Sequence, residues 1–271
     1  MNKIVIVLPG VPAELQAMTA SVASYLSNKI PAQKTLIKSL TLKVFGLGES
    51  QVNEKIASLM SMTNPTVALL AKKGEVHIRI TAKFTLDEAE REIKNMEKII
   101  REKLGDYIFG TDDETMEEVV GKLLIDKNIK ISLAESCSGG LVAHRLTNVP
   151  GISASLLCAV VSYSNEAKST FLKVSSELIK EKGAVSSEVA REMARGISAL
   201  TCSDVSVGIT GIAGPGGGTS EKPVGLVYIA LNTEDKDISH KYYFSGTRDM
   251  IKWRTSQATL DLIRRYILGK I

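Results

Sequence analysis

One segment, Lys130–Gly140 (KISLAESCSGG), most constrains the fold, because it predicts a buried strand that turns directly into a helix. The apolar run Ile131–Ala134 is typical of such a strand, and apolar residues at helical spacing follow the glycine pair. A helix that starts here leaves backbone N–H groups at its first turn, which can hold an anion or a developing oxyanion. Ser136, Cys137 and Ser138 place candidate nucleophiles at the same point. The segment is therefore a reason to expect an enzyme.

The second half of the chain, residues 112–271, alternates apolar strands with helices. Strands are predicted at Ile131–Ala134, Leu156–Ser162, Val205–Ile209 and Val224–Leu231, and a last helix from about Arg248 to Leu268. The spacing of Thr111 and Glu114 predicts a capping box that opens the first helix of this half. This alternation predicts an α/β layered domain with a buried sheet flanked by helices.

The middle of the chain, residues 32–111, predicts a smaller α+β domain. A strand at Leu36–Phe45 precedes a helical pattern that contains Val52 and Ile56. Strands Thr66–Ala71 and Glu75–Ala82 follow, joined by the hairpin signal Lys72-Lys73-Gly74. A second capping box, Thr85 to Glu88, then opens a long amphipathic helix that Gly105 ends.

The first 31 residues predict a strand and a helix only. The apolar run Ile4–Leu8 ends at Pro9-Gly10 and predicts a buried strand. Pro12 suits the first turn of a helix over Glu14–Leu26, and Lys29–Lys34 reads as a linker.

Composition excludes several classes of protein. The net charge of +4 is too mild to imply nucleic-acid binding by itself, and it suits a small anionic substrate equally well. Aromatic residues make up 5% of the chain, which argues against base-stacking platforms. The three cysteines form no CxxC pair, so we expect neither a disulfide framework nor a zinc site. No apolar run reaches the ~20 residues of a membrane helix, and no signal peptide is recognised, so we predict a cytoplasmic protein.

A second polar loop follows the strand Leu156–Ser162 and holds Tyr163, Asn165 and Lys168. Ligands gather at the carboxyl ends of strands in open α/β sheets, which places this loop beside Ser136. A neutral lysine amine next to a serine hydroxyl can act as a general base, provided that its pKa falls. Tyr163 can relay a proton. Each of these residues also has a purely structural interpretation: Ser136 as a helix cap, Lys168 as a solvated surface lysine and Tyr163 as a packed aromatic residue.

Cys137 and Glu135 leave further alternatives open. A thiol at a helix start is acidified and nucleophilic, but a buried cysteine that only packs is the more common situation. Glu135 either orients Lys168 or caps backbone donors.

A third loop, Gly208–Gly218, follows the strand Val205–Ile209 and is rich in glycine. It reads either as a flexible surface loop or as backbone that approaches a ligand phosphate. It matches neither a P-loop nor a dinucleotide fingerprint. Arg248 and Arg254 lie at the start of the last helix. The default interpretation is that they belong to a solvated helix face, although either can reach a phosphate.

An ordered set of motifs resembles the CinA family. AESCSGG, SYSNEAK, EKGAVSSEVAREMA, GITGIAGPGGGTSEKPVGLVYIAL and GTRD are similar to its C-terminal nicotinamide-nucleotide amidase domain, over about Thr111–Ile271. GLGES and GEVHIRITA resemble its KH-like middle domain, although the GXXG clamp of an RNA-binding KH module is absent. VLPGVPAEL resembles the last strand and helix of its molybdopterin-binding-like N-terminal domain, whose body is missing from this sequence, so the ADP-ribose pyrophosphatase activity linked to it is not expected.

The resemblance implies an activity and a set of site residues. It implies hydrolysis of nicotinamide mononucleotide to nicotinate mononucleotide and ammonia, with Ser136 as nucleophile, Lys168 as base and Tyr163 assisting proton transfer; Ser138 remains an alternative nucleophile. The implied substrate-binding residues are Ser138, Gly139, Gly140, Asn165, Thr210, Gly211, Ala213 and Gly214. We expect no metal, cofactor, nucleic acid or membrane, and a homodimer because the family forms one. The alternative is a nucleotide-binding scaffold, linked to competence or DNA damage, with little or no turnover.

Overall fold

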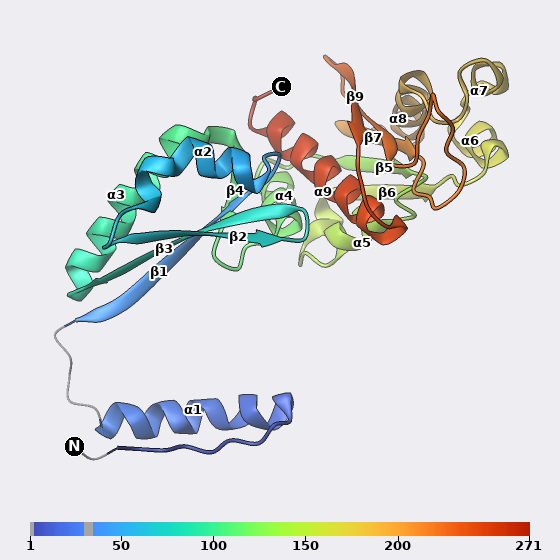
Figure 1. Cartoon of the computed structure of the whole chain (residues 1–271). Coiled ribbons are helices and arrows are strands. Elements are labelled where there is room, and N and C mark those ends of the chain that lie inside the picture. The colour runs from blue at the N-terminus through green and yellow to red at the C-terminus, as the bar shows by residue number, and fades with distance from the viewer. Residues whose placement is uncertain (1–2, 30–34) are drawn as a thin grey trace.

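The computed structural model describes residues 3–29 and 35–271, which contain two β-sheets flanked by helices (Figure 1). The mixed α/β class predicted from the sequence is confirmed. Helix α1 (Pro12–Lys29) begins at its proline as predicted and buries none of its residues. The strand predicted at Ile4–Leu8 is wrong: this run is extended but unpaired, and Val5 and Val7 are more than four-fifths exposed. It has no neighbouring strand to pair with among the described residues, and most of the predicted linker lies outside them.

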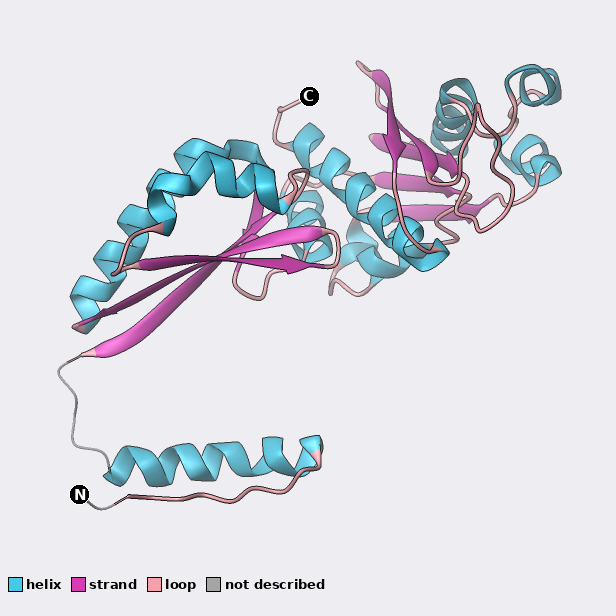
Figure 2. Cartoon of the chain, viewed as in Figure 1, coloured by secondary structure: helices cyan, strands magenta, loops and turns pink. Residues whose placement is uncertain are grey.

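The first sheet contains four antiparallel strands in the order β2-β3-β1-β4. Helices α2 and α3 cover one of its faces (Figure 2). The elements are β1 (Leu36–Val44), α2 (Glu49–Met60), β2 (Thr66–Lys72), β3 (Glu75–Phe84), α3 (Leu86–Leu104), a 3-10 turn (Gly105–Tyr107) and β4 (Ile108–Thr111). The predicted hairpin is confirmed, with Lys72 opposite Glu75. The short strand β4 was not predicted.

The second sheet has five strands in the order β6-β5-β7-β8-β9. Strands β6, β5 and β7 are parallel, whereas β8 and β9 extend the sheet in antiparallel fashion. The strands are β5 (Ile131–Glu135), β6 (Leu156–Val161), β7 (Val205–Gly211), β8 (Leu226–Asn232) and β9 (Asp237–Tyr243). The first four confirm the predicted strands. Strand β9 was missed because its sequence DISHKYY lacks a continuous apolar run.

Helices cover both faces of the second sheet. The carboxyl ends of its three parallel strands therefore lie between two layers of helices. Helices α6 (Asn165–Leu172), α7 (Ser176–Lys182) and α8 (Ser187–Thr201) pack on one face, and α4 (Met116–Asp126), α5 (Leu141–Thr147) and α9 (Arg248–Ile267) on the other. A 3-10 turn (Ile152–Ala154) precedes β6. No described helix has the length and apolar character needed to cross a bilayer.

Side-chain caps fix where several of these helices begin. The hydroxyls of Ser164, Ser186 and Thr247 accept backbone N–H groups at the starts of α6, α8 and α9. The predicted capping box at Thr111 is displaced by one turn: Glu114 does bind Thr111, but α4 starts at a second Thr-x-x-Glu pair, Thr115 and Glu118. The same spacing occurs twice in TDDETMEE, and Thr111 instead ends β4.

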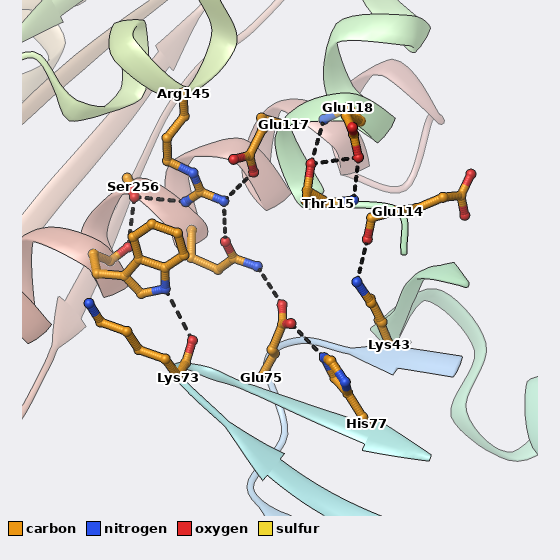
Figure 3. Close-up of polar contacts among 12 residues, drawn as sticks. Lys43, Lys73, Glu75, His77, Glu114, Thr115, Glu117, Glu118, Arg145 and Ser256 are labelled. Carbon is orange, nitrogen blue, oxygen red and sulfur yellow. Dashed lines mark hydrogen bonds and ion pairs between the residues drawn. The ribbon is translucent and has the colours of Figure 1, made fainter. Parts of the chain in front are cut away.

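A polar network joins the β2–β3 hairpin to α9 and α5 (Figure 3). Arg145 on α5 is 3% exposed, donates to Glu117, Ser256 and Gln257, and lies 4.3 Å from the ring centroid of Trp253. The Trp253 indole donates to the Lys73 carbonyl, and the Gln257 amide donates to Glu75. The two sheets are therefore held together through α9.

Gly208 in β7 allows α8 to lie against the sheet. A Cβ atom at this position would stand 2.1 Å from the Ala190 carbonyl oxygen and 2.7 Å from the Ala194 nitrogen. Gly208→Ala is therefore expected to lower the free energy of unfolding by about 2–3 kcal/mol or more, because backbone atoms must move. Denaturant unfolding measures this loss. Gly216→Ala, with open space around its Cβ position, is the control and is expected to unfold like the parent protein.

Candidate functional site

The carboxyl ends of β5, β6 and β7 bring together residues from three predicted loops. Ser136 follows β5, Lys168 lies on α6 beyond β6, and Thr210 lies near the end of β7. The Lys168 Nζ atom is 3.0 Å from the Ser136 Oγ atom. Because the strands are parallel neighbours, their loops meet at one edge, as the sequence predicted.

Lys168 lies in an environment that favours the uncharged amine. Its side chain is 2% exposed, and its other contacts are the carbonyl oxygens of Ser162, at 2.8 Å, and Tyr163, at 3.4 Å. Burial lowers the pKa of Lys168 below the usual value for lysine, and none of the hydrogen bonds of its amine among the described residues goes to a carboxylate. A neutral amine has two N–H donors for the two carbonyl oxygens, which leaves its lone pair for the Ser136 hydroxyl.

Tyr163 and Arg248 form a second pair beside the first. Arg248, at the first turn of α9, donates from Nη2 to the Tyr163 hydroxyl at 2.6 Å and from Nη1 to the Gly214 carbonyl at 2.7 Å. Tyr163 is 60% exposed and contacts Lys168 through its backbone carbonyl, so the described contacts direct its hydroxyl to Arg248. The pair places a cation at the mouth of the site.

A cavity of about 210 Å³ lies over these groups. Its lining is mixed polar and apolar: Ser136, Cys137, Tyr163, Asn165, Lys168, Ala184, Val185, Thr210, Gly211, Ala213 and Arg248. Thr210 is nearly buried, and its hydroxyl donates to the Ala184 carbonyl. Of the predicted glycine loop, Thr210, Gly211 and Ala213 thus reach the cavity, and Gly214 contributes through its carbonyl bond to Arg248.

The start of α5 differs from the prediction. Ser138, Gly139 and Gly140 are not part of the cavity lining, and the buried Ser138 hydroxyl has no hydrogen-bond partner among the described residues. The Glu135 carboxylate accepts the backbone N–H groups of Ala143, at 2.9 Å, and Val142, at 3.3 Å. A protein carboxylate therefore already occupies the helix start that was expected to hold an anion, which decides the open question about Glu135.

Cys137 has the environment of a packed thiol. It is 6% exposed, and burial raises the pKa of its thiol to about 12. A Cβ atom on Gly211 would stand 3.0 Å from its sulfur atom, so the thiol packs tightly against the end of β7. The thiolate is scarce at neutral pH, which makes Cys137 a poor nucleophile beside Ser136.

Sequence reasoning gave too little weight to Arg248, and it missed Ala184 and Val185. Arg248 is exposed, as the default interpretation expects, but it also lines the cavity and binds Gly214 and Tyr163. A signal was present, since Thr247 is a helix-capping residue type and Arg248 follows it directly. Ala184 and Val185 lie in the short connection between α7 and α8. They belong to the motif EKGAVSSEVAREMA, but their small apolar side chains do not by themselves indicate a ligand.

Residues 113–267 match the family described as CinA C-terminal domain, and residues 39–110 match the damage-inducible protein CinA KH domain. A protein of Moorella thermoacetica that carries the name of a competence-damage inducible protein is 46% identical over 97% of this chain. The match covers 64% of that relative, so the chain spans less than two thirds of the relatives' length.

Solved structures resemble a little more than half of the chain. The competence/damage inducible protein CihA from Agrobacterium tumefaciens is 36% identical with a TM-score of 0.53, over 56% of this chain and 95% of that one. A CinA superfamily protein from Klebsiella pneumoniae is 28% identical with a TM-score of 0.55, over 57% of this chain and 96% of that one.

Proposed function

Because this chain belongs to the CinA family, we propose that it is an amidohydrolase that converts nicotinamide mononucleotide to nicotinate mononucleotide and ammonia. The single observation that carries this proposal is the 3.0 Å contact between the Ser136 hydroxyl and the buried Lys168 amine. A serine with a neutral amine as its base is suited to acyl transfer from an amide.

The proposed reaction has two halves. Lys168 takes the proton of the Ser136 hydroxyl while the oxygen atom attacks the carboxamide carbon. Lys168 then gives that proton to the leaving nitrogen, the C–N bond breaks, and ammonia departs from an ester on Ser136. A water molecule, deprotonated by Lys168, attacks the ester carbon. The bond to the Ser136 oxygen breaks, Lys168 returns the proton to that oxygen, and nicotinate mononucleotide leaves.

Two further features suit this substrate. Cys137 follows the nucleophile directly and lines the cavity, and we assign its backbone N–H as the donor to the oxyanion. Arg248 supplies the cation for the phosphate, since the start of α5 is taken by Glu135. Tyr163 is then a group that orients Arg248 at the mouth of the cavity and a candidate for proton relay.

Removing the guanidinium of Arg248 is expected to weaken substrate binding more than it slows the chemical step. Arg248→Gln should raise KM about tenfold or more and lower kcat less, because a charge-assisted bond to phosphate contributes about 1.5–3 kcal/mol. Steady-state kinetics of ammonia release provide both constants. The control is Arg195→Gln on α8, whose guanidinium pairs with Glu192 and Asp237 at the surface. An unchanged KM in Arg248→Gln would argue against a phosphate role.

The pH dependence of kcat/KM should report the Lys168 amine. Only the unprotonated amine can accept the serine proton, so kcat/KM is expected to rise with pH and to level off once Lys168 is neutral. Since burial lowers the pKa of Lys168, the midpoint should lie below the ordinary lysine value. A kcat/KM that falls as the pH rises through this range would contradict the assignment.

Ammonia release from nicotinamide mononucleotide by the purified chain tests the activity itself. Equal amounts of ammonia and nicotinate mononucleotide are expected. The rival function, a nucleotide-binding scaffold of competence or damage response, predicts saturable binding with no product. The names of the relatives, which mention competence and damage, support this rival function.

We also propose a homodimer in the cytoplasm, with the domains divided at residues 1–31, 32–111 and 112–271. Support for the dimer comes from β6, an edge strand that exposes Leu157 by 46% and Val161 by 47%. Unpaired apolar edges favour association with a second chain. Light scattering after gel filtration gives the mass in solution.

A further inference from the structure

A second cavity, of about 540 Å³, lies between the two sheets and shares no residue with the first. Its walls come from the loop after β1, the β2–β3 hairpin, the end of β9 and the first half of α9. Ligand sites occur preferentially at such contacts between domains, and this volume is within the usual 300–1,000 Å³ range.

One wall of this cavity is aromatic. Tyr242 in β9 and Phe244, just after the strand, stack with ring centroids 5.4 Å apart and planes 15° from parallel. Phe45, which follows β1, adds a third ring to the lining. All three are half-buried, so each keeps part of its surface for a ligand. Stacked rings of this kind hold a planar heterocycle, at about 1–3 kcal/mol per ring.

The charged groups of the lining are not equally available. Both Glu75 carboxylate oxygens are engaged, one with His77 and the other with Gln257. Arg254 donates from Nη1 to the carbonyl and hydroxyl of Ser245, at 2.6 and 3.1 Å. These contacts leave its Nε and Nη2 groups without a partner among residues 3–29 and 35–271, where Arg254 makes no ion pair. The guanidinium is therefore available for an anionic group.

We propose that this cavity binds a mononucleotide-sized ligand, with its planar ring on Tyr242 and Phe244 and its phosphate at Arg254. Binding at this site is a function additional to the proposed amide hydrolysis, and it does not depend on that activity. The lining carries two cations, Arg254 and Lys72, and two carboxylates, Glu49 and Glu75. A single nucleotide fits this lining better than a nucleic-acid strand, because the carboxylates interrupt a track of phosphate contacts.

Trp253 provides a probe of this cavity in the intact chain. It is the only tryptophan. A Cβ atom on Gly74, a lining residue, would lie 3.6 Å from the indole Cδ1 atom. Titration with adenosine 5′-monophosphate should change the indole fluorescence saturably. Adenosine should bind about tenfold more weakly because it lacks the phosphate, and inorganic phosphate more weakly still because it lacks the ring.

Variants distinguish this site from the amidase cavity. Arg254→Gln should weaken the nucleotide about tenfold and leave adenosine unchanged, and Phe244→Leu should weaken both. Arg248→Gln, in the other cavity, should leave this titration unchanged. Isothermal titration calorimetry of the same variants repeats the comparison independently of Trp253.

Three outcomes would overturn the proposal: no saturable binding in either measurement, loss of binding in Arg248→Gln alone, or a 12-nucleotide single strand that binds far more tightly than the mononucleotide. Ammonia release is measured in a separate assay. Loss of amidase activity with nucleotide binding intact would reject only the proposed function, and the reverse result would reject only this site.

Discussion

Replacing Ser136 with alanine is expected to lower ammonia release from nicotinamide mononucleotide by at least about 10³-fold. The substitution removes the only hydroxyl that contacts the Lys168 amine among the described residues. Substrate affinity should change little, because the cavity keeps Arg248 and its other walls. Initial-rate measurements at saturating substrate give the loss in kcat, and calorimetric titration gives the affinity.

Ser138→Ala is the matched control for this experiment. Ser138 lies two residues away and is fully buried, but it does not line the cavity, and its hydroxyl makes no hydrogen bond among the described residues. Its variant should keep most of the activity and fold normally. The opposite pattern, with Ser136→Ala active and Ser138→Ala inactive, would move the nucleophile to position 138.

The second large effect concerns the amine. Lys168→Met should lower kcat by at least about 10³-fold, because no other described side chain is hydrogen-bonded to the Ser136 hydroxyl and able to accept its proton. The methionine side chain is similar in length and apolar, so the fold should be as stable as before or more stable. Lys168→Arg should be equally inactive, since a guanidinium stays charged and cannot act as a base.

Lys180→Ala serves as the control for lysine removal. Lys180 lies on the neighbouring helix α7 and is exposed. Its loss should leave both stability and turnover unchanged. Substantial activity in Lys168→Met, with the protein folded, would exclude this amine as the base.

The sequence predicted those parts of the fold whose signals are local. Apolar runs marked β5, β6, β7 and β8, and the pair Thr85 and Glu88 marked the start of α3. The errors arose where partners far along the chain decide the structure. Strand β9 exists because β8 lies beside it, and Ile4–Leu8 forms no strand because it has no partner among the described residues. Strand pairing is not readable from a single run of residues.

The candidate site was predictable in part for the same reason. Ser136 and Lys168 follow neighbouring parallel strands, so strand order alone brings them near each other. Arg248 reaches the cavity from a helix 80 residues after Lys168, a distance over which local patterns carry no information. For Glu135 the sequence left two roles open, and only the structure shows that its carboxylate caps α5 by folding back over the turn that holds the nucleophile.

The account depends above all on an uncharged amine at position 168, and nuclear magnetic resonance can observe this amine directly. Lysine labelled with ¹³C at Cε, with Lys168→Arg to assign the signal, allows titration of this one group against the exposed lysines. We predict a midpoint clearly below that of the exposed lysines, because burial disfavours the ammonium form. A Lys168 signal that titrates with the exposed lysines, or above them, would contradict the proposed mechanism.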